Sequence, residues 1–398
     1  MQTYKKIGIV GAGASGLFAS ILLSQKGYMV TILEKNNKVG KKLLATGNGR
    51  CNVTNQSISL KNFYSNSNIS LIQKNIENFT YDNCKDLFQK FGIEFKVVPS
   101  GRAYPLSLNS SSIVDILEYE ALKNGVKIEL NTEINDLKYE KNKFILNQNF
   151  TFDKIIVATG SIAMPKLGST DSGYQFAKKF KHSIVKPVAS LVQLVSSNKN
   201  LDIVSGVKVE VVIDGTRGDF LFAKYGVSGS LILDISRKVA KQLQTQKSIT
   251  LEVDTMPDFS FDELLIMLTK RVENLKDKEL FLWLDGIMNK KLAKYIILNS
   301  NIPSHIKYAK FLRKEDIRKI VKTIKKLPFI ITDTKGFETC EVCAGGINLE
   351  EINLENMESK KQKDLYFIGE VIDIDGDCGG YNLHWAWSSA YTLATNMK

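Results

Sequence analysis

The chain has 398 residues, of which 43% are hydrophobic and 24% charged, a composition that excludes a disordered or fibrous protein and predicts two or three domains. The net charge is +12, which indicates a polyanionic partner such as nucleic acid, unless it only reflects a Lys- and Asn-rich composition. No apolar run approaches the roughly 18 residues of a membrane-spanning helix, and no signal peptide is expected. The five scattered cysteines favour a reducing, cytoplasmic environment.

The first residues have the pattern of a strand, a glycine turn, a helix and a second strand. Gly11, Gly13 and Gly16 form a G-x-G-x-x-G motif. Gly11 permits the tight turn, Gly13 lets a pyrophosphate approach the backbone, and Gly16 lets helix and strand pack closely. Glu34 ends the second strand, 18 residues after Gly16, where it can accept a hydrogen bond from a ribose hydroxyl. The pattern predicts an α/β, Rossmann-like dinucleotide-binding domain.

Four features favour FAD over NAD as the dinucleotide. The motif opens the chain, and the basic, Gly- and Asn-rich loop Gly40–Asn55 follows the second strand directly. A second strand runs into Gly160, and a strand near the C-terminus precedes Gly369 and Glu370. An acid at that point can hold the ribityl chain of a flavin, and the N-terminus of the next helix can stabilise negative charge on the flavin ring.

At these motifs the chain resembles the BaiN/RdsA-type, YhiN-like flavoproteins, a family that includes aminoacetone oxidases. The matching stretches are GAGASGL, GKKLLATGNGRCNVTN, GRAYPLS, VATG, AGGI, GEVIDIDG and GGYNLHWAWSSA. The resemblance implies a two-dinucleotide-binding-type FAD domain built from both chain ends, with an inserted β-barrel and a small helical domain. The expected domains are 1–190 plus 341–398 for FAD binding, 191–255 plus 328–340 for the barrel, and 256–327 for the helices.

The resemblance also implies that the Gly40–Asn55 loop wraps the FAD, with Lys41, Lys42 and Arg50 as candidate charges for the pyrophosphate. The motifs and the resemblance together give these candidate FAD-binding residues: Gly11, Gly13, Ala14, Ser15, Gly16, Glu34, Lys35, Lys42, Leu43, Gly47, Asn48, Arg50, Cys51, Asn52, Ala158, Thr159, Gly160, Gly369, Glu370, Asp375, Gly380, Tyr381 and Asn382.

Three residues are candidates for catalysis, again by resemblance. Arg102 and Tyr104 lie in GRAYPLS, where they either line the substrate side of the pocket or belong to a turn held by Pro105. His384 lies in YNLHWAW, where the family usually has glutamine. It is either an acid toward the substrate or a hydrogen-bonding stand-in for that glutamine. His182 is expected to be structural.

Cys340 and Cys343 form a C-x-x-C pattern, which in a flavoprotein raises the possibility of a redox pair. The pair falls in a predicted strand, and side chains three apart on a strand point to opposite faces, which argues against a pair. Zinc needs about four ligands and no second cysteine pair exists, so no metal is expected.

Between these motifs, residues 188–236 show short β-type runs and residues 259–327 a helical pattern. In the helical part five basic residues recur at helical spacing: Lys307, Lys310, Lys314, Arg318 and Lys322. They form either a surface that binds RNA phosphates or an ordinary solvated helix face.

Four functions remain open. They are an NAD(P)H-driven reductase of uridine to dihydrouridine in large-subunit ribosomal RNA, a reductase of small unsaturated molecules, an amine oxidase that uses O₂, and a non-catalytic FAD-carrying RNA-binding protein. No second G-x-G-x-x-G motif is present, so NAD(P)H is expected to bind only transiently at the flavin.

Overall fold

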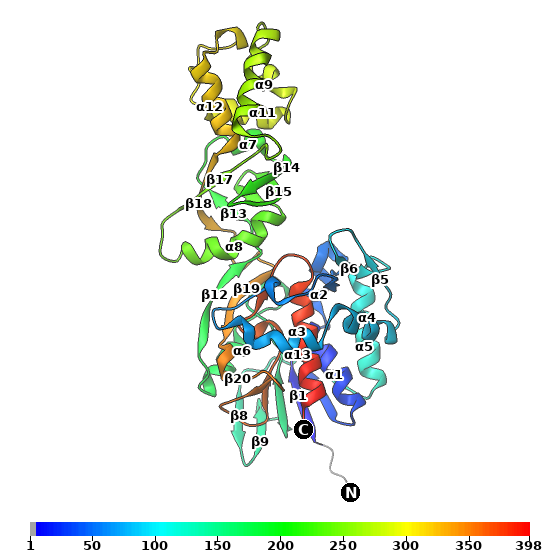
Figure 1. Cartoon of the computed structure of the whole chain (residues 1–398). Coiled ribbons are helices and arrows are strands. Elements are labelled where there is room, and N and C mark those ends of the chain that lie inside the picture. The colour runs from blue at the N-terminus through cyan, green and yellow to red at the C-terminus, as the bar shows by residue number, and fades with distance from the viewer. Residues whose placement is uncertain (1–4) are drawn as a thin grey trace. The chain divides into compact units, whose positions relative to one another are not determined.

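The computed structural model describes residues 5–398. They form two compact units: the first ends at Ala189 and resumes at Cys340, and the second is Ser190–Thr339 (Figure 1). The first unit spans nearly the residues expected for the FAD domain, 1–190 plus 341–398.

A seven-stranded sheet forms the centre of the first unit, in the order β20-β21-β22-β11-β1-β2-β7. The five strands from β22 to β7 are parallel, and β21 and β20 add an antiparallel edge. The strands are β1 (Lys6–Val10), β2 (Met29–Leu33), β7 (Lys127–Glu129), β11 (Lys154–Val157), β20 (Ile352–Asn353), β21 (Glu358–Ser359) and β22 (Leu365–Phe367). Parallel strands end at one edge of the sheet, which is where open α/β sheets bind ligands.

Helices from both ends of the chain cover this sheet. Helix α1 (Ala14–Gln25) packs against α13 (Tyr381–Asn396) and against α5 (Ser110–Lys123), and the blue and red helices lie close together in Figure 1. Phe18 of α1 stacks on Phe88 and meets Trp387 of α13 edge-on, with ring centroids 5.7 and 5.5 Å apart. The C-terminal helix is therefore part of the core of the N-terminal strand-helix-strand unit.

Shorter elements complete the first unit. They are α2 (Lys41–Ala45), α3 (Gln73–Asn78), α4 (Tyr81–Lys90), α6 (Ser172–Lys179), β3 (Thr54–Asn55), β4 (Phe63–Tyr64), β5 (Phe95–Val97), β6 (Arg102–Pro105), β8 (Leu137–Glu140), β9 (Lys143–Leu146), β10 (Phe150–Phe152), β12 (Ile184–Ser190), β19 (Val342–Ile347) and β23 (Asp375–Gly376). The 3₁₀ turns are η1 (Thr46–Gly49), η2 (Leu60–Asn62), η3 (Ile69–Ile72), η4 (Pro165–Leu167), η6 (Leu349–Glu351) and η7 (Gly369–Val371).

The second unit contains a six-stranded antiparallel sheet in the order β14-β15-β16-β13-β18-β17. A bridge between Val212 and Asp254 brings the two edge strands together, as in a closed barrel. Its strands are β13 (Leu194–Ser196), β14 (Lys208–Ile213), β15 (Thr216–Ala223), β16 (Gly226–Ser228), β17 (Ile249–Val253) and β18 (Leu327–Thr334).

Residues 230–236 differ from the expected β-type run, because they belong to helix α8 (Ser230–Gln242). Its buried residues recur at helical spacing, with Leu231 and Ile232 followed by Ser236, Val239 and Ala240. A short apolar run such as SLILDIS does not by itself distinguish a strand from a helix that is buried on one side.

Helices fill the rest of the second unit: α7 (Leu201–Val204), α9 (Phe261–Asn274), α10 (Leu280–Asp285), α11 (Lys290–Asn299), η5 (Ala309–Phe311) and α12 (Lys314–Lys325). The helices and the sheet share one hydrophobic cluster of buried residues. Helix α12 buries Ile317, Ile320, Val321 and Ile324, the positions that the 3.6-residue period predicts.

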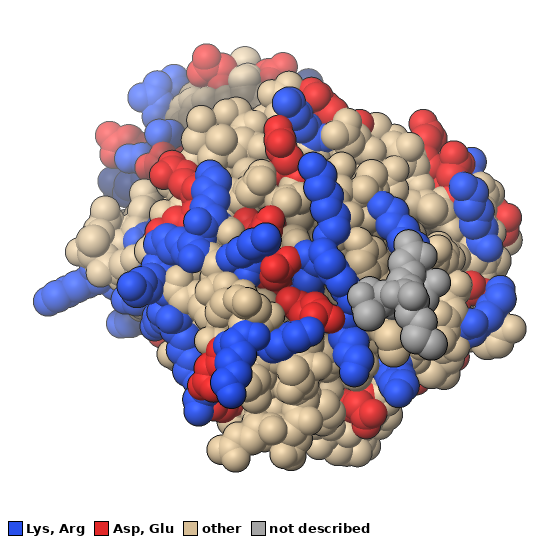
Figure 2. Space-filling model, turned by 90° about the horizontal axis from the view of Figure 1, so that it is seen from below, with Lys and Arg blue, Asp and Glu red and all other residues tan. Residues whose placement is uncertain are grey.

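The five basic residues that recur at helical spacing in the sequence do not lie on one continuous helix. Lys314, Arg318 and Lys322 lie on α12, whereas Lys307 and Lys310 precede it on an extended segment and on η5. On the face viewed in Figure 2, Lys and Arg are intermixed with Asp and Glu, so the positive excess is not gathered there into one patch.

None of the helices among the described residues is both long and apolar enough to cross a membrane.

Candidate cofactor and active site

The three motif glycines have different steric surroundings. Gly11 has φ +106°, and a Cβ on it would lie 2.6 Å from the carbonyl oxygen of Ala158. A Cβ on Gly16 would lie 2.0 Å from the carbonyl oxygen of Gly11, so this position has no room for a side chain. A Cβ on Gly13 would meet no atom within 4 Å. The space beside Gly13 at the N-terminus of α1 is therefore open, as a bound pyrophosphate requires.

Glu34 is held rigidly beside this turn. Its Oε2 accepts from the backbone N–H of Ala12 at 2.8 Å, and its Oε1 accepts from the backbone and side-chain amides of Asn36 at 2.8 and 2.7 Å. Lys35 beside it is half-buried. Asn36 was not predicted as a site residue, because nothing in its spacing marks it as the partner that orients the carboxylate of Glu34.

The loop Gly40–Asn55 contains an unusual density of left-handed backbone. Gly47, Asn48, Gly49 and Cys51 have φ of 58°, 55°, 80° and 56°. Glycine and asparagine tolerate this conformation best, which accounts for the composition of the loop. The loop begins against the motif, where the Gly40 N–H donates to the Ala12 carbonyl at 2.9 Å.

The side chains of this loop divide between the core and the surface. Leu43 and Cys51 are buried, whereas Asn48 and Arg50 are exposed. Burial raises the pKa of the Cys51 thiol to about 12, although a hydrogen bond with Thr46 opposes the shift. Cys51 is therefore a protonated core thiol rather than a nucleophile.

Glu370 joins this loop to the end of β11. Its Oε2 accepts from Lys42 Nζ at 2.8 Å and from Ser161 Oγ at 3.3 Å. Burial alone lowers the pKa of Lys42, but the carboxylate of Glu370 outweighs it and raises the pKa above its ordinary value. A Cβ on Gly160 would lie 4.0 Å from the same Glu370 oxygen. Gly160, which follows this strand after Ala158 and Thr159, therefore lies close to Glu370.

The C-terminal motif encloses the same region. Gly369 has φ +74°, and a Cβ on it would lie 2.6 Å from Ser15 Oγ at the start of α1. Gly380 has φ +97° and a Cβ there would lie 2.6 Å from the carbonyl oxygen of Thr54. Asn382 clamps the preceding turn, because its amide bonds to both the N–H and the carbonyl of Gly376 at 2.8 Å.

Asp375 and Tyr381 flank that turn in the sequence. Asp375 is buried in β23, where it pairs with Tyr64, and the ring of Tyr381 meets Phe63 edge-on at 6.2 Å. Both are positioned to support the backbone of the turn.

Asn52 provides an independent test of whether a dinucleotide fits these residues. Its side-chain oxygen is buried and has no hydrogen-bond partner in the described chain. A buried acceptor without a partner is costly, so a ligand donor is expected to meet it. The imide N–H of a flavin ring is such a donor. Together with the open space at Gly13, this unpaired oxygen fits FAD.

Two of the three catalytic candidates lie on β6. Tyr104 is largely buried, and the guanidinium of Arg50 lies 5.2 Å from its ring centroid. Arg102 is half-buried, and its Nη2 lies 3.4 Å from the carbonyl oxygen of Cys378. Glu341, which sequence reasoning missed, lies near Arg102 and Lys42. Solvent reaches part of the Glu341 side chain, but the protein around its carboxyl partly removes water from it and so raises its pKa. The positive charges of Lys42 and Arg102 oppose this shift.

His384 lies in the core rather than facing a ligand. It is fully buried, its Nε2 donates to the Phe79 carbonyl at 2.7 Å, and its Nδ1 accepts from Thr54 Oγ1 at 2.7 Å. A carbonyl can only accept, which assigns the proton to Nε2. Burial lowers the pKa of His384 to about 4, although the Phe79 carbonyl opposes the shift. We therefore do not retain His384 as the proton donor.

The C-x-x-C thiols of Cys340 and Cys343 are also buried, and neither is part of a disulfide bond. A hydrogen bond with Cys340 and burial both raise the pKa of Cys343. Neither observation favours a reactive thiolate. In residues 5–398 no three His, Cys, Asp or Glu side chains are grouped as a metal site would require.

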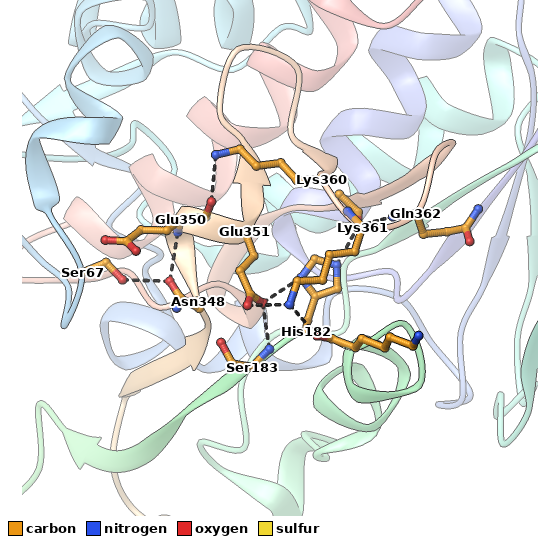
Figure 3. Close-up of polar contacts among 11 residues, drawn as sticks. Ser67, His182, Ser183, Asn348, Glu350, Glu351, Lys360, Lys361 and Gln362 are labelled. Carbon is orange, nitrogen blue, oxygen red and sulfur yellow. Dashed lines mark hydrogen bonds and ion pairs between the residues drawn. The ribbon is translucent and has the colours of Figure 1, made fainter.

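A separate polar cluster surrounds His182 (Figure 3). Its Nε2 lies 2.7 Å from Ser359 Oγ, and its Nδ1 lies 3.3 Å from Glu351 Oε2. The order Ser-His-Glu matches a hydrolytic triad in residue types only. Ser359 is buried and its oxygen already accepts from the backbone N–H groups of Lys361 and Gln362 at 3.0 and 2.9 Å. The cluster therefore connects β21, η6 and the segment between α6 and β12, and it presents no free nucleophile.

The fold and the site together define a Rossmann-type FAD-binding protein. The model of the family described as HI0933-like protein Rossmann domain matches residues 5–396, and the chain belongs to this family. A 3-dehydro-bile acid delta(4,6)-reductase of Clostridium scindens is 32% identical over 97% of both chains. The ribosomal RNA dihydrouridine synthase of Haemophilus influenzae is 31% identical over all of both chains, and that of Escherichia coli 30% identical over 98% of this chain and 97% of its own.

These relatives confirm the resemblance inferred from the motifs, the α/β FAD-domain fold and the enzyme class. The chain is an oxidoreductase. The role of each candidate site residue remains a prediction.

The motif glycines give a matched pair of variants. We expect Gly16→Ala to unfold or strongly destabilise the protein, by about 3 kcal/mol or more, because its Cβ would overlap the Gly11 carbonyl oxygen. We expect Gly13→Ala to melt like the wild type without FAD but to lose FAD affinity at least tenfold, since its Cβ fills the open space. Thermal melts with and without added FAD measure both effects. Wild-type FAD affinity in Gly13→Ala would contradict the assignment of the pyrophosphate site.

His384 predicts a specific dependence of stability on pH. Its folded pKa of about 4 lies below the usual 6.5, so only the unfolded chain takes up this proton as the pH falls between these values. The contribution of His384 to the free energy of unfolding is fully present above pH 6.5, and it falls by about 3 kcal/mol as the pH drops to 4. Glutamine can make both hydrogen bonds without titrating, so His384→Gln should flatten this loss in urea-unfolding free energies.

The same variant separates a structural from a catalytic role. We expect His384→Gln to leave the pH profile of kcat/KM unchanged. A profile that loses its acidic or basic limb in the variant would return His384 to the catalytic residues.

Proposed function

We propose that the chain is an FAD-dependent reductase of a carbon–carbon double bond and that its substrate is a uridine of large-subunit ribosomal RNA. The chemistry is supported by two relatives whose names describe saturation of such a bond, since dihydrouridine is uridine with its C5=C6 bond reduced. A ribosomal substrate also agrees with the cytoplasmic location expected from the sequence.

The observation that carries the choice of RNA is a row of exposed cations on α12. Lys314, Arg318 and Lys322 are exposed on the side opposite the buried isoleucines. Within residues 5–398 none of the three makes an ion pair, whereas many other cations of the chain do. Unpaired cations at helical spacing are suited to contact successive phosphates of a nucleic acid.

The residues of the first unit would divide the work at the cofactor. The pyrophosphate would lie in the open space at Gly13, Glu34 would accept from the ribose hydroxyls, and the Lys42–Glu370 pair would hold the loop against the cofactor. Bound FAD would supply the hydride, with NAD(P)H as the proposed transient electron donor. The net reaction is uridine + NAD(P)H + H⁺ → dihydrouridine + NAD(P)⁺.

Arg102 and Tyr104 are the proposed substrate-side residues. Arg102 is half-buried on β6 and can donate to a carbonyl oxygen of the base. Tyr104 holds the Arg50 guanidinium by a cation–π contact. This contact would order the exposed part of the loop beside the cofactor.

The bile-acid reductase relative favours a second candidate, a reductase of small unsaturated molecules, because its identity to this chain is similar to that of the RNA-modifying relatives. The two candidates share the cofactor site and differ only in the substrate.

Mass spectrometry of large-subunit ribosomal RNA decides between them. We expect one uridine to gain two hydrogens in the parent strain, to lack them in a deletion strain, and to regain them when the wild-type gene, but not Gly13→Ala, is returned. Identical spectra from parent and deletion strains would rule out the RNA substrate. NADPH oxidation with steroid enones would then test the second candidate.

The cationic row has its own test. We expect Lys314→Glu/Arg318→Glu/Lys322→Glu to bind RNA at least tenfold more weakly and to lower the slope of log K against log salt by about 2–3, with FAD content unchanged. The control is Lys74→Glu/Lys90→Glu/Lys96→Glu, three exposed lysines of the first unit with the same charge change. Equal losses in the two variants would mean that net charge, and not this surface, governs binding.

A further inference from the structure

Two aromatic rings next to the cationic row are exposed to solvent. Tyr308 is 40% and Phe311 55% exposed, although both belong to a segment that is anchored in the core. The anchors are Ile306, Ala309 and Leu312, which are buried at intervals of three residues. This period matches the 3₁₀ turn η5, in which side chains three apart lie above one another. The same geometry that buries the anchors therefore places Tyr308 and Phe311 together on the outside.

Lys310 lies between the two rings. Its Nζ is 5.7 Å from the centroid of Tyr308 and 5.6 Å from that of Phe311, so one ammonium group contacts both rings. Its only other partner among the described residues is Asp277 at 3.0 Å. Both ends of this ion pair are exposed, so little free energy is needed to exchange the carboxylate for another anion.

A short backbone pairing keeps this segment rigid. The N–H of Ala309 donates to the Lys278 carbonyl at 3.0 Å, and the N–H of Lys310 donates to the Lys276 carbonyl at 2.8 Å. The pairing also places exposed Lys276 and Lys278 alongside the segment that carries Lys310. Two rings and several cations are thereby fixed on one ribbon.

We propose that Tyr308, Lys310 and Phe311 form a base-stacking platform for single-stranded RNA, continuous in sequence with the cationic row of α12. Unpaired bases stack on exposed aromatic rings whatever their identity, and neighbouring ammonium groups bind the phosphates. A base-paired duplex offers no free base faces, so the platform selects unpaired segments of an RNA. The proposal rests on the proposed RNA substrate and adds which form of RNA the second unit recognises.

The experiment measures binding of fluorescent RNA by the full-length, FAD-loaded protein. The probes are a single-stranded oligoadenylate, which contains no uridine, and a duplex RNA of equal length. We expect Tyr308→Ala/Phe311→Ala to bind the oligoadenylate about tenfold or more weakly, with little change for the duplex and in the salt slope, because no cation is removed. Tyr308→Trp/Phe311→Trp should bind at least as tightly as the wild type.

The matched control is Tyr119→Ala/Tyr225→Ala. These tyrosines are 63% and 36% exposed, and each has a lysine amine over its ring, at 5.8 and 5.0 Å. We expect this control to bind both probes like the wild type. If Tyr308→Ala/Phe311→Ala binds oligoadenylate with wild-type affinity, the platform proposal is wrong. The exposed rings would then be assigned to contact with a protein partner. An equal loss for duplex and single strand overturns the platform as well.

The use of oligoadenylate separates this proposal from the proposed function. If ribosomal RNA shows no dihydrouridine that depends on the gene, the choice of substrate fails while the platform is still judged by binding. If the dihydrouridine is present but the alanine variant binds oligoadenylate normally, only the platform fails.

Discussion

The close approach of Gly369 to Ser15 is the contact on which the site in the first unit depends. It brings the end of the C-terminal strand β22 against the first turn of α1, with no room for a side chain between them. The N–H of Gly369 donates to Ser389 Oγ and its carbonyl accepts from Trp385 Nε1, so α13 is fixed by the same residue. As a result Glu370, the next residue, is placed beside the N-terminal motif although more than three hundred residues separate the two in sequence.

Local patterns made the cofactor turn predictable. Glycines at fixed spacing, an acid at the end of the second strand and a loop rich in glycine and asparagine each state a backbone requirement that the sequence alone expresses. The pairing of Lys42 with Glu370 is different in kind. Both residues were candidates, but their contact depends on the path of the chain between them, which no local pattern specifies.

His384 shows where residue type misleads. Histidine near a flavin motif suggests proton transfer, yet its chemistry is decided by burial and by its two hydrogen-bond partners, which come from distant residues 54 and 79. A fully buried imidazole with a lowered pKa stays neutral and supports the core. Its donor and acceptor atoms do what a glutamine amide can do, which explains why the two side chains suit one position.

Whether the cations of the second unit indicate a binding surface depends on their neighbours. A basic composition alone predicts scattered, mostly paired cations, such as Arg217 between Glu210 and Asp258 or Lys238 beside Asp214. Among residues 5–398, Lys314, Arg318 and Lys322 of α12 have no such partners, and the nearby Lys310 lies between two rings that solvent can reach. Exposed aromatic surface is unfavourable in water and compositional bias toward lysine does not account for it. The combination of unpaired cations with fixed, exposed rings is therefore a stronger argument for RNA than the net charge, because it requires a partner that offers both phosphates and flat apolar faces.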